Sequence, residues 1–242
     1  MQPHVKLAPG QIPPYVLVCG DPARAEQIAR LMQDPKELAY NREYRTFVGT
    51  YEGERLAVTS HGVGSAGAAI CFEELIKVGA RVLIRVGTCG SLTDKLGQGD
   101  HIVASAAVRE DGVSSLLIPL GYPAVADLQV IQALEKACQD VKAPYQRGII
   151  LASDVFYPGL LPTSLELYSK ANVPGVEMEC ATLFVIASLR GVKAGAIATV
   201  DGNPLKWQEG DYDPHGEKVA QGKARMLKIG LAAMAALSRA KV

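Results

Sequence analysis

The sequence predicts a single α/β domain in which helices cover a central sheet. Apolar runs of strand length alternate along the chain with segments whose apolar residues recur at helical spacing. Hydrophobic residues make up 48% of the 242 residues, enough for a large core, and no low-complexity or linker-like stretch interrupts them. Because the order strand, helix, strand repeats, we expect a largely parallel sheet and one domain over residues 1–242.

The first predicted unit is a strand, a turn and an amphipathic helix. The apolar run Tyr15–Cys19 is the strand, and apolar residues from Ala25 to Met32 then recur at i, i+3, i+4 and i+7. Asp21 is a suitable N-cap residue and Pro22 suits the first helical position, so both mark the start of this helix.

The other elements follow from the same two patterns. Short apolar runs predict strands, and the longer segments between them show helical spacing. The predicted strands cover residues 47–51, 55–60, 81–86, 101–107, 146–152 and 194–200, and the predicted helices cover residues 68–78, 127–140, 180–190 and 217–239.

Charge and cysteine content exclude several classes of protein. The chain has 25 Lys plus Arg against 25 Asp plus Glu, and this balance argues against a nucleic-acid partner. The N-terminus does not resemble a secretory signal, and no apolar run approaches the roughly 18 to 20 residues that span a bilayer. The five cysteines form no CxxC pair, which is typical of buried free thiols in a reducing compartment. We therefore expect a cytoplasmic protein without a membrane partner.

Residues 62–67, Gly-Val-Gly-Ser-Ala-Gly, match the G-x-G-x-x-G pattern of dinucleotide-binding turns. That binding mode also needs an acid about 20 residues on, at the end of the next strand. Here that strand ends in Gly87-Thr88. We therefore expect these glycines to let the backbone approach a ligand or a packed neighbour closely, not to bind a nicotinamide cofactor.

Two other turns are better suited to an anion. Gly20 ends a strand, and Arg24 lies in the first turn of the helix that follows, where backbone N–H groups are free. Arg85 lies near the end of an apolar strand, with the hydroxyl of Thr88 between two glycines after it. Both turns predict phosphate binding. The alternatives are an internal salt bridge for Arg85 and a merely exposed helix residue for Arg24.

Three carboxylates also stand out. Glu177 and Glu179, at i and i+2, would face the same side of an extended segment and could grip the two hydroxyls of a ribose. A first-turn charge preference explains the same pair equally well. Asp201 follows the predicted strand 194–200, and the carboxyl ends of parallel strands are where α/β proteins bind ligands. Turn chemistry is the alternative there.

Together these segments resemble the nucleoside phosphorylase superfamily. The resemblance is strongest to its hexameric purine nucleoside phosphorylases, in particular those of apicomplexan parasites, and extends to the related uridine phosphorylases. It runs from about residue 4 to the C-terminal helix. The segments that carry it are GDPARAEQI (20–28), AYNREYRTF (39–47), SHGVGSAG (60–67), IRVGTCGSL (84–92), SDVFYPG (153–159), VEMECATL (176–183) and VDGNPLKWQEGDYD (200–213).

The resemblance implies a fold and an assembly. The expected fold is a twisted, mixed, partly barrel-like sheet flanked by helices, in a homohexamer of three dimers whose sites are shared across the dimer interface. Arg42 would reach into a neighbouring subunit's phosphate site, and His4 would contact the 5′-hydroxyl there. Within one chain the implied phosphate ligands are Gly20, Arg24, Arg85 and Thr88, and the implied nucleoside contacts are Tyr157, Val176, Glu177, Met178 and Glu179.

The implied activity is phosphorolysis of purine ribonucleosides such as inosine and guanosine, in purine salvage. Phosphate attacks C1′ of the ribose through a cationic transition state, while the purine leaves with negative charge. Asp201 would protonate the leaving purine, a role that favours a raised pKa. Inorganic phosphate is then a co-substrate, and neither a cofactor nor a metal is expected. The chain has no HExxH motif or Cys/His cluster.

Three alternatives remain open. Uridine phosphorylases carry a Gln-Glu-Arg stretch after the corresponding turn, whereas here Leu160 and Leu161 follow Gly159. A phosphate-independent nucleosidase has no use for three arginines that converge, and a non-catalytic nucleoside sensor has no use for an acid at the leaving group.

The chain departs from the family pattern at one point. Many hexameric members have an arginine in the loop after the catalytic acid, but residues 203–217 contain Lys206 and no arginine.

Overall fold

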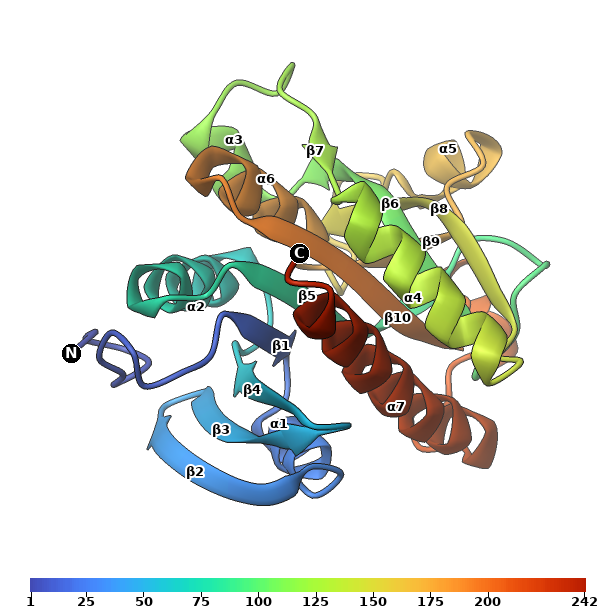
Figure 1. Cartoon of the computed structure of the whole chain (residues 1–242). Coiled ribbons are helices and arrows are strands. Elements are labelled where there is room, and N and C mark those ends of the chain that lie inside the picture. Colours follow the sequence, from blue (N-terminus) through green and yellow to red (C-terminus); the bar gives the residue numbers. More distant parts are fainter.

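One ten-stranded sheet runs through the computed structural model, which describes residues 1–242. Five of its strands close into a barrel, because the last strand of the series pairs with the first (Figure 1). In order around the barrel they are β5 (Val82–Ser91), β10 (Lys193–Gly202), β6 (His101–Glu110), β8 (Tyr145–Ser153) and β9 (Gly175–Glu177). The mixed, partly barrel-like sheet that the resemblance implied is therefore present.

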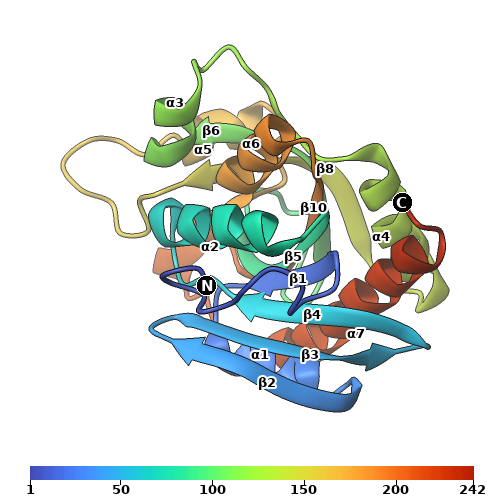
Figure 2. The ribbon, with the colours of Figure 1, turned by 60° about the vertical axis from the view of Figure 1, so that its left-hand side comes forward.

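The remaining strands extend from the first half of β5, on the edge opposite β10. β1 (Tyr15–Cys19) pairs with β5 and β4 (Glu54–Ser60), and β3 (Tyr44–Tyr51) and β2 (Gln33–Asn41) continue outward (Figure 2). The two-residue strand β7 (Ala124–Val125) pairs with β6. β5 thus belongs both to the barrel and to the open part of the sheet.

The expectation of a largely parallel sheet is wrong. Parallel pairs join β1 to β4 and β5, β5 to β10, and β8 to β6 and β9, but an equal number of pairs are antiparallel. Tight turns join β2, β3 and β4, so these neighbours pair as antiparallel hairpins. The barrel also needs two antiparallel contacts, β10 with β6 and β9 with β5, to close.

The helices pack on both sides of this sheet. α4 (Leu128–Asp140) and α7 (Glu217–Arg239) lie side by side along β10 (Figures 1 and 2). α2 (Ser65–Val78) packs against α6 (Cys180–Arg190), and α1 (Pro22–Ala29) covers β3 and β4. The short helices are α3 (Gly112–Leu117), α5 (Leu165–Lys170) and the 3-10 helix η1 (Pro204–Glu209). None of the helices combines the length and apolarity needed to cross a membrane.

Between these layers lies one large core, to which the long helices and the central strands contribute. Phe72 of α2 and Phe184 of α6 are fully buried in it beside Leu17 and Ile84 of the sheet. All five cysteines are buried and unpaired, as the sequence predicted.

Most predicted elements are present, with different ends in some cases. β1, α6 and α7 have the predicted bounds, but β5 continues to Ser91, five residues beyond the predicted end at Val86. The Gly87-to-Gly90 segment is therefore strand and not turn. β2 was not predicted, because it is an exposed edge strand without an apolar face, and Pro35 in it is compatible only with such an edge.

Asp127, predicted as the first helical residue of its segment, instead caps α4 from outside. Its carboxylate accepts hydrogen bonds from the backbone N–H groups of Gln129 at 2.9 Å and Val130 at 3.3 Å. We expect Asp127→Ala to lower the free energy of unfolding by about 1 kcal/mol and Asp127→Ser to lose much less. Thermal unfolding followed by circular dichroism tests this, and equal melting temperatures for the two variants would show that the cap does not contribute.

Candidate active site

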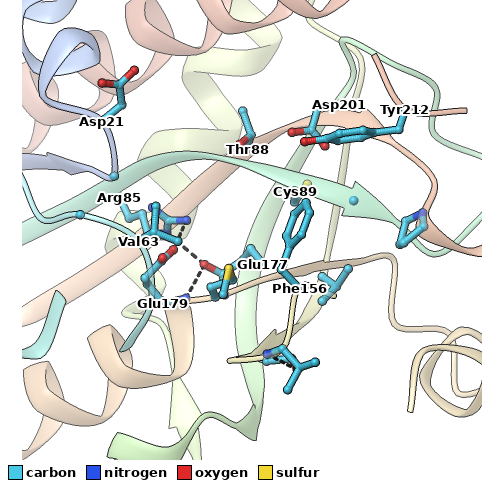
Figure 3. Close-up of a pocket in the computed structure, with 18 of the residues that line it drawn as sticks. Asp21, Val63, Arg85, Thr88, Cys89, Phe156, Glu177, Glu179, Asp201 and Tyr212 are labelled. Carbon is cyan, nitrogen blue, oxygen red and sulfur yellow. Dashed lines mark hydrogen bonds and ion pairs between the residues drawn. The ribbon is translucent and has the colours of Figure 1, made fainter. Parts of the chain in front are cut away.

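A cavity of about 640 Å³ opens where β5, β9 and β10 meet the turn after β1 (Figure 3). Its remaining walls come from two loops, residues 153–165 and 203–212, from the turn after β4 and from Glu43. The sequence-predicted site residues that line it are Gly20, Arg24, Arg85, Thr88, Val176, Glu177, Met178, Glu179 and Asp201. These residues come from four separate segments of the chain, which the closed sheet brings together.

Arg85 is the centre of a buried ion cluster at one end of the cavity. Its Nε donates to Glu177 Oε2 at 3.0 Å, and its Nη2 lies 2.5 Å from Glu179 Oε2 (Figure 3). Nη1 lies 3.2 Å from Nε2 of His61. Burial by itself lowers the pKa of Arg85, but the two carboxylates more than reverse this, so its pKa is raised and the charge is permanent. The internal salt bridge considered for Arg85 exists, in a residue that also lines the cavity.

Gly87 makes room for this guanidinium. Residues 85 and 87 face the same side of β5, and a Cβ on Gly87 would lie 2.8 Å from Cζ of Arg85. No larger residue fits there unless the arginine moves. The glycine therefore serves the packing of a charged group against a strand, a role distinct from the anion-binding turn that was predicted for it.

Glu177 and Glu179 lie on the same side, as their spacing predicted, and there both contact Arg85. Glu179 Oε1 also accepts from the backbone N–H of Gly64 at 2.6 Å, and Glu177 accepts from the backbone N–H groups of Glu179 and Cys180 at the start of α6. Burial raises the pKa of Glu179, and Arg85 opposes that rise. The Gly62–Gly67 turn thus approaches a buried carboxylate closely, in agreement with the predicted role of its glycines.

The turn after β1 is capped from within. The Asp21 carboxylate accepts from the backbone N–H of Ala23 at 2.8 Å, and Pro22 has no N–H to offer. Fewer free backbone donors therefore face an anion here than the sequence suggested. Arg24, half-buried in the first turn of α1, supplies the positive charge that lines the cavity from this side.

Asp201 occupies a bulge of β10 at the end of the cavity opposite Arg85. Val200 pairs with Cys89 and Gly202 with Gly90, so Asp201 has no partner on β5 and its side chain turns into the cavity beside Thr88 (Figure 3). Burial raises the pKa of Asp201 to about 6, against the opposing effect of a hydrogen bond from Thr88. A carboxyl group with this pKa can hold a proton near neutral pH and release it during a reaction.

Aromatic rings that the sequence prediction did not include cover the cavity next to Asp201. The ring centroids of Phe156 and Tyr212 each lie 5.2 Å from that of Trp207. Tyr157, which was predicted to line the base pocket, lies outside the cavity with 79% of its surface exposed, and Phe156 takes that place. Both aromatics belong to the segment 153–159 that carries the resemblance, but only the course of the loop decides which ring faces inward.

The loop that carries Trp207 is tied back to its own strand. Gly202 bridges to Tyr212, and the Asn203 N–H donates to the carbonyl of Asp211 at 2.8 Å. A Cβ on Gly202 would lie 2.4 Å from that same carbonyl oxygen, so this close return requires glycine. The bridge holds Tyr212 over the cavity next to Asp201.

His4 and Arg42 lie outside the cavity of their own chain. His4 Nδ1 is 2.7 Å from Glu74 Oε1, and its backbone N–H also donates to Glu74. The carbonyl of His4 accepts from the side chain of Asn41, the residue before Arg42. The two residues predicted to act on a neighbouring subunit thus lie close together, at the N-terminal segment and the end of β2.

The chain matches the family model described as Phosphorylase superfamily over residues 14–235. It is 50% identical to a purine nucleoside phosphorylase of Plasmodium vivax, over 99% of this chain and 98% of that protein. It is 38% identical to a uridine phosphorylase of Thermococcus kodakarensis, over 91% of this chain and 83% of that one. Among solved structures it is similar to the Toxoplasma gondii purine nucleoside phosphorylase in complex with immucillin-H, with a TM-score of 0.96, 44% identity, and 99% and 97% of the two chains covered.

The raised pKa of Asp201 predicts a pH-dependent loss of stability. In the unfolded chain this carboxyl has its ordinary pKa of about 3.8, and in the fold its pKa is about 6. Folding is therefore penalised as pH rises between these values, and the full penalty applies above about pH 6. We expect Asp201→Asn to melt higher than wild type at about pH 8, with an advantage that shrinks as pH falls toward about 4.

Melting temperatures across this pH range measure the effect. Asp34→Asn, which replaces an exposed carboxylate on β2, is the control and should show no such trend. An Asp201→Asn advantage that is equal at both ends of the pH range would contradict the raised pKa.

Proposed function

Because this chain belongs to the phosphorylase superfamily, we propose that it catalyses the reversible phosphorolysis of purine ribonucleosides to free base and ribose 1-phosphate. The arrangement of charge along the cavity carries this proposal. Arg24 lines the cavity from the turn after β1. Arg85 lies at one end with the carboxylate of Glu179 beside it, and an acid with a pKa of about 6 lies at the other (Figure 3). A nucleoside that reacts with phosphate needs these three groups in that order.

Phosphate is the nucleophile in the proposed reaction. It binds at Gly20, Arg24, Arg85 and Thr88, where the guanidinium groups compensate its charge and hold one oxygen near C1′. In this scheme the Thr88 hydroxyl turns from Asp201, to which it donates in the structure, to the bound anion. The sugar becomes cationic as the C1′–N9 bond breaks, and the bound anion stabilises that charge. Glu179 accepts hydrogen bonds from the ribose hydroxyls, with Glu177 supporting it and Met178 against the sugar.

Asp201 completes the reaction at the base. The electron pair of the broken C1′–N9 bond passes to the purine, and the protonated carboxyl group of Asp201 donates to N7 of the departing base. The new bond joins a phosphate oxygen to C1′, so ribose 1-phosphate and a neutral purine are formed. Val176, Phe156 and Trp207 provide the apolar surface against which the base packs. No metal or other cofactor takes part in this scheme.

A purine is the better candidate for the base than a pyrimidine. The stretch after Gly159 is Leu-Leu-Pro, with Leu160 and Leu161 exposed, and offers none of the amide or guanidinium groups that would recognise a uracil. The relative from Plasmodium vivax is named a purine nucleoside phosphorylase. Uridine phosphorylase is the second candidate, since relatives of that name are also similar to this chain.

The remaining alternatives are less consistent with the site. A nucleosidase uses water, which does not need the positive charge of Arg24 and Arg85. A non-catalytic sensor does not need an acid at the leaving group, yet Asp201 occupies a bulge there with a raised pKa.

The working enzyme is proposed to be a homohexamer of three dimers in the cytoplasm, acting in purine salvage. Arg42 and His4 lie outside their own cavity, so each would complete the site of a neighbour, at its phosphate and 5′-hydroxyl respectively. Five reduced, buried thiols suit the cytoplasm. Sedimentation velocity tests the assembly, and a fully active monomer would contradict it. Imaging of a tagged chain tests the compartment.

Dependence on phosphate separates the candidate activities. Wild-type protein incubated with inosine and phosphate should release hypoxanthine and ribose 1-phosphate, with no turnover when phosphate is omitted. The products are identified by chromatography and mass spectrometry, with uridine as the matched pyrimidine substrate. Free ribose formed without phosphate would indicate a nucleosidase, and faster turnover of uridine than of inosine would indicate a uridine phosphorylase.

Substitution of Asp201 tests the general acid. Asp201→Asn keeps the size of the side chain but cannot deliver the proton, so we expect kcat on inosine to fall by about 100-fold or more while KM changes by about threefold or less. Steady-state kinetics measure both quantities. A kcat within about threefold of wild type, a change below about 1 kcal/mol, would exclude Asp201 as the acid.

A further inference from the structure

His61 has no place in the proposed chemistry, yet it is fully buried directly behind the phosphate site. It follows β4, and its backbone N–H donates to the carbonyl of Cys19 at the end of β1. The imidazole lies under the turn after β1, where a Cβ on Gly20 would be 4.0 Å from Cε1 of His61. The ring therefore lies between the two segments that supply Gly20 and Arg85.

The contact with Arg85 determines the state of the imidazole. Nε2 of His61 is 3.2 Å from Nη1 of Arg85. A guanidinium only donates, so Nε2 must accept, and the single proton of a neutral ring is then on Nδ1. Burial and the charge of Arg85 both hold the pKa of His61 well below its usual value, in agreement with a neutral ring.

A neutral acceptor is what this position requires. The guanidinium already contacts two carboxylates, Glu177 through Nε and Glu179 through Nη2. A third carboxylate would hold the arginine equally well but would repel a phosphate in the cavity. The imidazole instead adds no charge and accepts from Nη1. Of the five N–H groups of Arg85, two then remain for a ligand, one on each terminal nitrogen.

We propose that His61 is a positioning residue for phosphate: its neutral imidazole accepts from Nη1 of Arg85 and fixes the guanidinium so that its two remaining N–H groups serve the anion. This rests on the proposed function, in that phosphate is the ligand of Arg85. Without the imidazole, the two carboxylates alone hold the arginine, and the guanidinium can rotate toward Glu177 and Glu179 and away from the anion.

Two amide substitutions of different reach test this role. The amide oxygen of His61→Gln can take the place of Nε2, whereas the shorter side chain of His61→Asn stops near the position of Nδ1. We expect His61→Asn to weaken the binding of inorganic phosphate by about tenfold or more, and His61→Gln to stay within about threefold of wild type. Calorimetric titration of the whole protein measures binding, and KM for phosphate at saturating inosine should rise more than kcat falls.

The controls separate positioning from folding. His101→Asn replaces another fully buried histidine whose Nε2 faces an arginine, Arg225 Nε at 3.2 Å, outside the cavity, and it should leave phosphate binding unchanged. If His61→Asn does not fold, His61→Met, apolar and of similar volume, takes its place with the same expectation.

Two results would overturn the role of His61. One is phosphate affinity in His61→Asn, or in His61→Met where that variant replaces it, equal to that of wild type. The other is a folded His61→Gln that binds phosphate as weakly as His61→Asn. Phosphate binding without formation of ribose 1-phosphate would contradict the proposed function alone. A wild-type protein that binds no phosphate would contradict both.

Discussion

A guanidinium removed from water constrains much of this molecule. Arg85 lies on β5, the strand shared by the barrel and the open part of the sheet, and an unpaired charge there would cost several kcal/mol. Its partners come from three other places in the chain: the end of β9, the start of α6 and the turn after β4. A shift of any of these segments would cost the buried guanidinium one of its hydrogen-bond partners. One buried cation thus fixes the walls of the cavity to the centre of the sheet.

Strands β5 and β10 give the cavity its two chemically different ends. β5 carries Arg85 near its middle and Thr88 further along, while β10 contributes Asp201 at the bulge opposite Cys89. In a regular register residue 201 would have had a partner on β5. The bulge interrupts this pairing and turns the side chain of Asp201 into the cavity. The formal net charge of the chain is zero, but the cavity has one end where Arg85 is paired with two carboxylates and another end with a protonatable acid.

The sequence was informative wherever a local rule decides the outcome. Apolar runs located β1 and most other strands, and the spacing of Glu177 and Glu179 correctly predicted that they lie on the same side. Features that depend on distant pairing were missed. The antiparallel contacts that close the barrel, the edge strand β2 and the inward turn of Phe156 in place of Tyr157 leave no local signal. His61 was missed because its importance comes from Arg85, 24 residues away.

The aromatic cover of the cavity has an optical consequence. Trp207 is the single tryptophan of the chain, and it packs between Phe156 and Tyr212 at the mouth of the site. All indole emission of the chain therefore originates at one wall of the cavity, with no background from the core. A ligand that enters next to Asp201 changes the surroundings of that one fluorophore, so the protein carries its own spectroscopic reporter of occupancy.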